Sequence, residues 1–234
     1  MHNFKKGFLI FLLLLIAIAT PSNSSAKELF NVEERLTNYL KEHEKDIAGL
    51  ATIVINQDNT IYKMKGYSNI EKQIPIDEDT VFEWGSVSKI LIWISVFQLV
   101  EKGKLDLETD IHTYLPQDFQ SKARFENPIT MRHLMNHSAG FDDSYTDLML
   151  PSPAKTTPLR DVLEQARVKQ VFPPGDVVAY SNYGSGLATY IVERISGLDY
   201  QRYVRENILE PLRMTKTAIA PDLSDHQWVK EQRG

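Results

Sequence analysis

Residues 87–102 form the strongest helical segment of this chain, and their composition leaves few ways to fold around them. In the eight positions that follow Lys89, Ser95 is the single polar residue, so the predicted helix has almost no polar face. A helix that is apolar all round is buried at the centre of a domain. Gly103 comes next and is a residue type that ends helices. We therefore expect a central buried helix over residues 87–102.

Ser86 and Lys89 stand at the start of this helix, three residues apart. Residues at this spacing share a helix face, so the Lys89 amine can reach the Ser86 hydroxyl. The helix N-terminus adds positive potential and free backbone N–H groups at the serine. A capping serine beside a surface lysine is the alternative, although the apolar run after Lys89 makes a purely surface role awkward. The same spacing occurs twice more, across an expected processing site and in a proline-rich loop: Ser24/Lys27 and Ser152/Lys155.

The tripeptide Tyr-Ser-Asn also occurs twice, at residues 67–69 and at residues 180–182. The first copy lies at the exit of a predicted hairpin. The second lies between a Pro-Pro-Gly turn and the glycine-rich start of a predicted helix, a place where side chains often serve a functional site. Spacing alone does not choose between the two copies, but the second supplies Tyr180 and Asn182 as candidate partners of Ser86.

A serine hydroxyl needs a base before it can attack a carbonyl carbon. Lysine and tyrosine side chains both have ordinary pKa values of about 10, so the pKa of one must be lowered. The Lys89 ammonium could hold Tyr180 as a phenolate, since two unit charges about 4 Å apart interact by about 4 kcal/mol at an effective dielectric of about 20. Alternatively, burial and neighbouring charge could leave Lys89 neutral. The sequence leaves both bases open, and in either case Asn182 would orient Lys89 and the substrate amide.

Turn and capping signals predict one hairpin followed by a long helical stretch. A helix is expected from Asn31, and strands over residues 50–56 and 60–67 with Asp58 and Asn59 in the turn. Later helices are expected over residues 130–136, 157–167, 184–196 and from 199 to Pro211. An isolated hairpin is not stable alone, and no later segment has a convincing strand pattern. This favours a chain that is C-terminally incomplete.

The first 26 residues have the pattern of a signal peptide. Lys5 and Lys6 form a basic region, residues 8–19 are apolar, and the small residues 24–26 offer a cleavage site before Lys27. The alternative is an uncleaved N-terminal membrane anchor, although the apolar run is short for a membrane span. Either way, we expect residues 27–234 to form a domain that is secreted or otherwise extracytoplasmic, with membrane contact only through the N-terminal segment if it is uncleaved.

Composition excludes several kinds of site. The chain has no cysteine, which rules out disulfides and a thiol nucleophile. Its net charge is -5, and removing residues 1–26 deletes Lys5 and Lys6, so the mature charge is -5 - 2 = -7. With no basic patch, nucleic acid is not an expected partner. His133 and His137 have the i, i+4 spacing of a zinc motif, but Leu134 replaces the required glutamate and no third ligand is evident. We expect no metal and no cofactor.

Taken in order, six stretches resemble the family of class C beta-lactamases, low-molecular-weight penicillin-binding proteins (D-alanyl-D-alanine peptidases) and related esterases. The resemblance covers roughly residues 50–217. The stretches are 79–89 (DTVFEWGSVSK), 99–105 (LVEKGKL), 114–116 (YLP), 129–140 (ITMRHLMNHSAG), 174–184 (PG through YSNYG) and 210–214 (EPLRM).

The resemblance implies an α/β fold, in which an antiparallel sheet carries an inserted helical domain and the sheet is incomplete in this chain. It assigns Ser86 as nucleophile, Lys89 and Tyr180 as the proton-transfer pair, and Asn182 as a substrate contact. His137 lies in a recurrent family stretch that looks structural. The family's Lys-Thr-Gly or His-x-Gly strand, which would supply an oxyanion N–H donor, is absent, since residues 216–218 come too early in the chain.

Two functions follow from the resemblance. The first is an exported serine hydrolase that cleaves an amide or ester through a Ser86 acyl-enzyme, with a beta-lactam, a peptidoglycan D-Ala peptide or a small ester as substrate. The second is a truncated, non-catalytic remnant or cell-wall-binding module that keeps the helical domain. Whether this chain is an enzyme is left open by its sequence.

Overall fold

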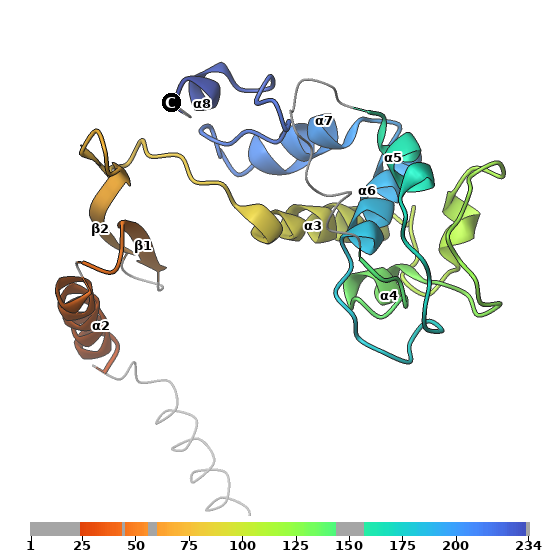
Figure 1. Ribbon diagram of the computed structural model, residues 1–234, viewed down its shortest axis with the longest axis horizontal. Helices are drawn as coiled ribbons and strands as arrows, with labels where there is room; N and C mark the ends of the chain where they lie inside the picture. Colours follow the sequence, from red (N-terminus) through yellow and green to blue (C-terminus); the bar gives the residue numbers. More distant parts are fainter. Residues whose placement is uncertain (1–23, 44, 56–59, 144–156, 233–234) are drawn as a thin grey trace, which may run out of the picture. The chain divides into compact units, whose positions relative to one another are not determined.

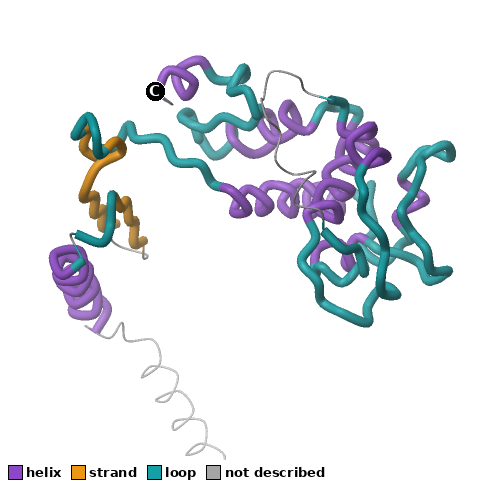
Figure 2. The backbone as a smooth tube through the Cα atoms, in the orientation of Figure 1, coloured by secondary structure: helices purple, strands orange, loops and turns teal. Residues whose placement is uncertain are grey.

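The computed structural model describes residues 24–43, 45–55, 60–143 and 157–232. It divides into two compact units, residues 1–80 and residues 81–234 (Figure 1). The strands of the described residues all lie in the first unit, and the second is built from helices and loops (Figure 2).

The first unit is a hairpin with one helix and a short third strand. Helix α2 (Ser24–Glu42) precedes β1 (Gly49–Ile55) and β2 (Thr60–Asn69), and β3 (Ile74–Pro75) extends the sheet in the order β1-β2-β3. The expected hairpin is confirmed, with Gly49 opposite Gly66 and Ile55 opposite Thr60. Gly66 has a φ of 86°, and a Cβ there would lie 2.3 Å from the Ala48 carbonyl oxygen, so glycine is required where the strands come together. The predicted turn at residues 58–59 lies outside the described residues.

Two details of this unit differ from the sequence prediction. Helix α2 begins at Ser24 rather than Asn31. The residues between them are mostly good helix formers, so the helix continues through the expected cap. Strand β3 was not predicted, because it has two residues and one is Pro75, a residue type confined to sheet edges. An ion pair of 2.7 Å between Lys63 Nζ and Glu33 Oε1 links α2 to β2.

The second unit is organised around helix α6 (Asn182–Ser196), in which nine residues are buried. It contacts α3 (Lys89–Glu101), α4 (Met131–Met135), α5 (Leu159–Gln165) and α7 (Tyr200–Val204). Its central residues Ala188, Ile191 and Val192 have no exposed surface, so they lie at the middle of the apolar core. Gly197, with a φ of 74°, ends the helix in the left-handed conformation that glycine adopts without strain.

The predicted central helix begins differently and is buried on one side only. Residues Gly85–Ser88 form a short 3-10 turn, η1, and the α-helix α3 runs from Lys89 to Glu101. One face is buried in the unit through Leu91, Ile92, Ser95, Val96 and Leu99. The expectation of burial all round is wrong, because the opposite stripe of Val87, Ile90 and Phe97 is between 48% and 66% exposed. Composition identified an apolar helix but not the extent of its packing.

The later helices largely follow the sequence prediction. Helix α4 is one residue shorter at each end than the expected 130–136, because Thr130 is its N-cap, with its side chain accepting from His133 N–H, and Asn136 is its C-cap. Helix α5 begins at Leu159, so Pro158 and not Thr157 occupies the N-cap position. Helix α6 begins at Asn182, two residues before the expected start, because Ser181 caps it.

The C-terminal part of the second unit contains elements that the sequence did not indicate. Asp199 precedes α7 but makes no side-chain cap, and Glu193 Oε1 accepts from Tyr200 N–H at 2.8 Å instead. A π-helical turn, η4 (Arg205–Leu209), continues α7, and a last helix, α8 (Gln227–Gln232), follows. The short turn η2 (Ile111–Tyr114) was also unexpected.

Among the described residues, no helix combines the length and apolar character needed to cross a membrane. The predicted signal segment lies almost wholly outside these residues, since the description starts at Ser24. The expected domain boundaries, 1–26 and 27–234, therefore stay predictions.

Candidate active site

The expected nucleophile lies in the tight turn that leads into α3. Ser86 is the second residue of η1, and its backbone continues without a break into the helix. Gly85, with a φ of 52°, provides the left-handed residue at the start of the turn. The Ser88 hydroxyl donates to the Gly85 carbonyl oxygen at 2.6 Å and closes the turn. This geometry leaves the Ser86 side chain exposed.

The Lys89 amine lies between the serine and the second Tyr-Ser-Asn copy. Its Nζ is 3.3 Å from Ser86 Oγ and 2.7 Å from Asn182 Oδ1. It also lies 5.0 Å from the centroid of the Tyr180 ring, within the range of a cation–π contact. A lysine with these three neighbours is not the free surface lysine of the alternative interpretation.

Tyr180 reaches the same serine from the loop before α6. Its hydroxyl donates to Ser86 Oγ at 2.8 Å, across 94 residues of sequence. Burial is the largest influence and raises the pKa of Tyr180, but the hydrogen bonds to Lys89 and Ser86 and the charge of Lys89 oppose it. Together they hold this pKa below its ordinary value. Tyr180 is thus placed, and electrostatically biased, to exchange a proton with Ser86.

His137 supports the loop that carries Tyr180. Its ring packs on the Tyr180 ring with centroids 4.4 Å apart, its Nδ1 accepts from Ser181 N–H at 3.2 Å, and its carbonyl oxygen accepts from Ala179 N–H at 2.8 Å. Burial, assisted by the positive charge of Lys89, lowers the pKa of His137 below its ordinary value. The neutral ring therefore remains an acceptor for Ser181. His137 adopts a φ of 54°, which is uncommon outside glycine.

Asn182 is the first residue of α6 and is held on two sides. Its Oδ1 accepts from Lys89, while its Nδ2 donates to Asp143 Oδ2 at 2.6 Å and its backbone N–H donates to Asp143 Oδ1 at 3.2 Å. Asp143 was not among the residues expected at the site. The only signal in the sequence is its position, three residues after Gly140 and directly after Asp142, and this pair of carboxylates forms no recognised motif.

The structure therefore brings together all four expected site residues, Ser86, Lys89, Tyr180 and Asn182. Their roles stay predictions, but the arrangement has a clear chemical capacity. A hydroxyl has two proton-handling groups within hydrogen-bond distance or close to it, which is what activation of a serine nucleophile requires. Both Lys89 and Tyr180 remain candidates for the base.

Within the first unit, the Tyr-Ser-Asn copy at residues 67–69 makes local contacts. Asn69 Oδ1 accepts from Lys72 N–H at 2.8 Å and shapes the turn after β2. Ser24 and Lys27 lie on α2, and Ser152 and Lys155 lie outside the described residues. The two histidines with zinc-like spacing have separate partners as well, since His133 Nδ1 accepts from Thr130 N–H at 3.1 Å in the cap of α4.

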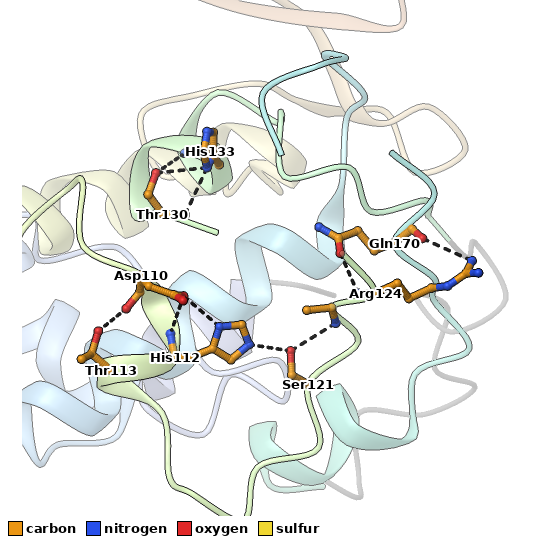
Figure 3. A network of polar contacts seen from close by, with 9 residues as sticks. Asp110, His112, Thr113, Ser121, Arg124, Thr130, His133 and Gln170 are labelled. Atoms are coloured by element: carbon orange, nitrogen blue, oxygen red, sulfur yellow. Dashed lines mark hydrogen bonds and ion pairs between the residues drawn. The ribbon is translucent and has the colours of Figure 1, made fainter. Parts of the chain in front are cut away.

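A second polar cluster has the outline of a catalytic triad and was not anticipated (Figure 3). His112 lies between Asp110 and Ser121, with Nδ1 2.8 Å from Asp110 Oδ1 and Nε2 2.9 Å from Ser121 Oγ. Asp110, however, caps η2, because its side chain accepts from His112 N–H. Ser121 is also bound to its neighbours: its N–H donates to the Phe119 carbonyl oxygen, and its Oγ accepts from Ala123 N–H. Because the backbone N–H of the serine is already used, it cannot serve an oxyanion, and the cluster ties down the loop after η2.

The chain is similar in sequence to proteins that are already known. A family model described as Beta-lactamase matches residues 32–233. A beta-lactamase of Escherichia coli K12 is 28% identical over 207 residues, covering 88% of this chain and 52% of the relative. A putative penicillin-binding protein, PbpX, of Bacillus subtilis 168 is 29% identical over 184 residues, covering 78% of this chain and 43% of the relative.

Among solved structures, a D-amino acid amidase from Ochrobactrum anthropi SV3, crystallised with L-phenylalanine amide, is similar with a TM-score of 0.65 and 25% identity. The match covers 79% of this chain and 52% of the amidase. The chain thus spans about half the length of the curated relatives it matches.

Proposed function

Because this chain belongs to the beta-lactamase family, we propose that it is a serine hydrolase that cleaves an amide or ester through an acyl-enzyme on Ser86. The family's expected fold is present, with helices and an antiparallel sheet that has three strands among the described residues. The observation that supports the activity most directly is the meeting of Tyr180 Oη and Lys89 Nζ at Ser86 Oγ, at 2.8 and 3.3 Å.

In the proposed reaction, the Ser86 hydroxyl loses its proton to Tyr180 or Lys89 as Oγ attacks the substrate carbonyl carbon. A new Oγ–C bond forms, the bond from that carbon to the leaving nitrogen or oxygen breaks, and the same base returns the proton to the leaving group. Water then repeats the sequence on the acyl-enzyme and releases the acid. If Tyr180 is the base, the hydrogen bond of the resting site is reversed, and the Ser86 hydroxyl donates to a phenolate that the Lys89 charge stabilises.

Three substrate classes fit this chemistry: a beta-lactam, a peptidoglycan D-Ala peptide and a small ester. The relatives support the first two, since one is called a beta-lactamase, one a penicillin-binding protein and one a D-amino acid amidase. These are all acyl transfers from nitrogen or oxygen, and they differ in the leaving group and in the groups beside the carbonyl. We propose the acyl-enzyme step for this chain and leave the substrate among these classes to experiment.

The same proposal includes export. The basic, apolar and small-residue pattern of residues 5–26 would direct the chain across the cytoplasmic membrane and leave a mature N-terminus at Lys27. N-terminal sequencing of the exported protein measures this directly. A protein that begins at Met1 in the membrane fraction would instead be anchored by this segment.

The proposed activity is tested by covalent labelling. A fluorescent penicillin and an activated ester are each mixed with the full chain, and intact mass and peptide mapping identify the modified residue. We expect one adduct, on Ser86, that is lost in Ser86→Ala and kept in Ser121→Ala, the serine of the triad-like cluster. Labelling that persists in Ser86→Ala would contradict the assignment. Absence of any adduct on the folded protein would favour the non-catalytic, cell-wall-binding alternative.

A further inference from the structure

We propose that Asp143 is a positioning residue of the Ser86 site, which fixes the Asn182 amide in the one orientation that lets it hold Lys89. This inference rests on the proposed function for its catalytic consequence, but the contact itself can be measured without activity. Asp143 is not an expected member of the site, and its two hydrogen bonds to described residues of the site both go to Asn182. The positioning effect would therefore pass through Asn182.

The geometry of the contact determines which way the amide faces. Both oxygens of the Asp143 carboxylate accept from the same residue, Oδ2 from Asn182 Nδ2 at 2.6 Å and Oδ1 from Asn182 N–H at 3.2 Å. A carboxylate can only accept, so it selects the NH₂ end of the amide. The Oδ1 end must then face the other way, where it accepts from Lys89 Nζ at 2.7 Å. With the amide reversed, its NH₂ group would face the ammonium and the bond would be lost.

The position of Asp143 is set by the two residues before it. Phe141 is buried and forms an isolated antiparallel bridge with the fully buried Gln170. Asp142 then anchors the chain, since its N–H donates to the Lys169 carbonyl oxygen at 2.9 Å and its Oδ1 accepts from Lys169 N–H at 2.6 Å. Two adjacent carboxylates thus have different tasks: Asp142 binds backbone on the Lys169 side, and Asp143 binds the start of α6.

Charge adds a second effect of the same contact. Among the described residues, the charged and titratable groups that act on Tyr180 beside Ser86 are Lys89, His137 and Asp143. The Asp143 charge opposes ionisation of Tyr180 and so raises the pKa of that hydroxyl, against the stronger lowering by Lys89. Removing the carboxylate should therefore both free the amide and shift the Tyr180 titration to lower pH.

The kinetic test compares two matched variants, Asp143→Asn and Asp142→Asn, which remove the same charge one residue apart. Single-turnover acylation of Ser86 by the activated ester is measured on the full chain. We expect Asp143→Asn to slow acylation about 10²-fold, the size of effect that a displacement of about 1 Å has on a reacting group. Asp142→Asn removes the charge but keeps a side-chain oxygen that can accept from Lys169 N–H, so the anchor should be preserved and the rate unchanged. In an Asn182→Ala background, Asp143→Asn should cause no further slowing, because its effect passes through Asn182.

The pH profile of acylation distinguishes positioning from simple loss of structure. In Asp143→Asn, the pH at which acylation reaches half of its maximal rate should become lower. A variant that is merely less stable would have a lower maximal rate at an unchanged midpoint pH. Additive effects of Asp143→Asn and Asn182→Ala, or an unchanged rate in Asp143→Asn, would overturn the proposal while leaving the Ser86 activity standing.

An NMR measurement that does not depend on catalytic activity distinguishes the positioning role of Asp143 from the proposed acylation of Ser86. In ¹H–¹⁵N spectra of the full chain, the Asn182 side-chain amide is identified by its loss in Asn182→Ala. We expect its hydrogen-bonded resonance to move upfield in Asp143→Asn and to stay in Asp142→Asn. If no variant is acylated but this shift occurs, the proposed function fails and the contact stands. If the resonance does not move, the positioning role of Asp143 is wrong whether or not Ser86 is acylated.

Discussion

The two Tyr-Ser-Asn copies have the same three residues and similarly exposed tyrosines, yet they take part in different structures. Tyr67 is 44% exposed and Tyr180 is 48% exposed, so exposure does not distinguish them. The first copy ends a strand, where Asn69 binds Lys72 and Ser68 Oγ donates to the Ile74 carbonyl oxygen. These two partners lie within six residues. The first copy is therefore a local turn.

The second copy is defined by residues that are distant in the sequence. Tyr180 binds a serine 94 residues away, Asn182 binds a lysine 93 residues away and an aspartate 39 residues away, and Ser181 N–H binds His137 across 44 residues. The difference teaches that a short motif acquires chemistry from the neighbours that the fold supplies. Changing the same position in both copies tests this difference directly.

The largest difference is expected at the tyrosines. Tyr180→Phe removes a hydroxyl that lies against Ser86 Oγ, so acylation of Ser86 should slow by about 10²–10⁴-fold, the usual contribution of a positioned proton-transfer group. Tyr67→Phe should leave the rate unchanged. The rate of adduct formation by stopped-flow fluorescence or mass spectrometry measures both. Equal rates in the two variants would remove Tyr180 from the reaction.

A smaller but still kinetic difference is expected at the asparagines. Asn182→Ala frees Lys89 and should slow acylation about 10²-fold, because the amine is no longer held at the serine. Asn69→Ala removes the bond to Lys72 N–H and should lower the free energy of unfolding by about 1 kcal/mol without changing acylation. Urea unfolding beside single-turnover labelling separates the outcomes. Slow acylation in Asn69→Ala would mean that the first copy also serves the site.

At the serines only stability should change. Ser181 caps α6, and its hydroxyl accepts from Gly184 N–H at 3.1 Å, so Ser181→Ala should cost about 1 kcal/mol of unfolding free energy. Ser68 donates a long, exposed bond of 3.3 Å, so Ser68→Ala should cost only a few tenths of a kcal/mol, the usual level for a surface substitution. Urea unfolding measures these differences as shifts of the midpoint concentration, provided that the dependence of the unfolding free energy on urea is the same in both variants. A larger loss in Ser68→Ala than in Ser181→Ala would reverse the expected order.

The smallest expected difference between the two copies is in the pH dependence of backbone amide exchange. The folded pKa of His137 is lowered, so its neutral form is favoured and its bond to Ser181 N–H is present at neutral pH. That contribution is complete above the ordinary histidine pKa and is lost as pH falls through the lower folded pKa. Amide exchange at Ser181, corrected for its intrinsic rate, should lose protection on acidification. Exchange at Lys72, held by the non-titrating Asn69, should not, and parallel behaviour of the two amides would contradict the His137 assignment.

Much of the fold could be predicted because its signals are local. Apolar spacing, Thr130 and Gly197 placed the helices α4 and α6 within about two residues, and alternation placed the hairpin. The sequence prediction was wrong where tertiary packing determines which side chains are buried. Residues 87–102 look uniformly apolar, so the sequence does not say that Leu91 and Leu99 face the core while Ile90 and Phe97 are exposed.

The site divides in the same way. Ser86 and Lys89 are three residues apart on one turn, so their contact follows from helix geometry alone. The choice of Tyr180 over Tyr67 needed either the family resemblance or the fold. Asp143 was out of reach, because a carboxylate that binds an amide 39 residues away has no periodic or motif signal.

The site is assembled from η1, α3, the loop at His137, the segment at Asp143 and the start of α6. Contacts between segments so distant in sequence form only when the chain between them has closed, which is the slow part of folding. Reactivity of Ser86 toward an acylating probe is therefore also a report on the folded population of residues 81–234. In a refolding experiment, the time at which Ser86 becomes reactive would mark the closure of this unit, whereas helix signals would already have appeared.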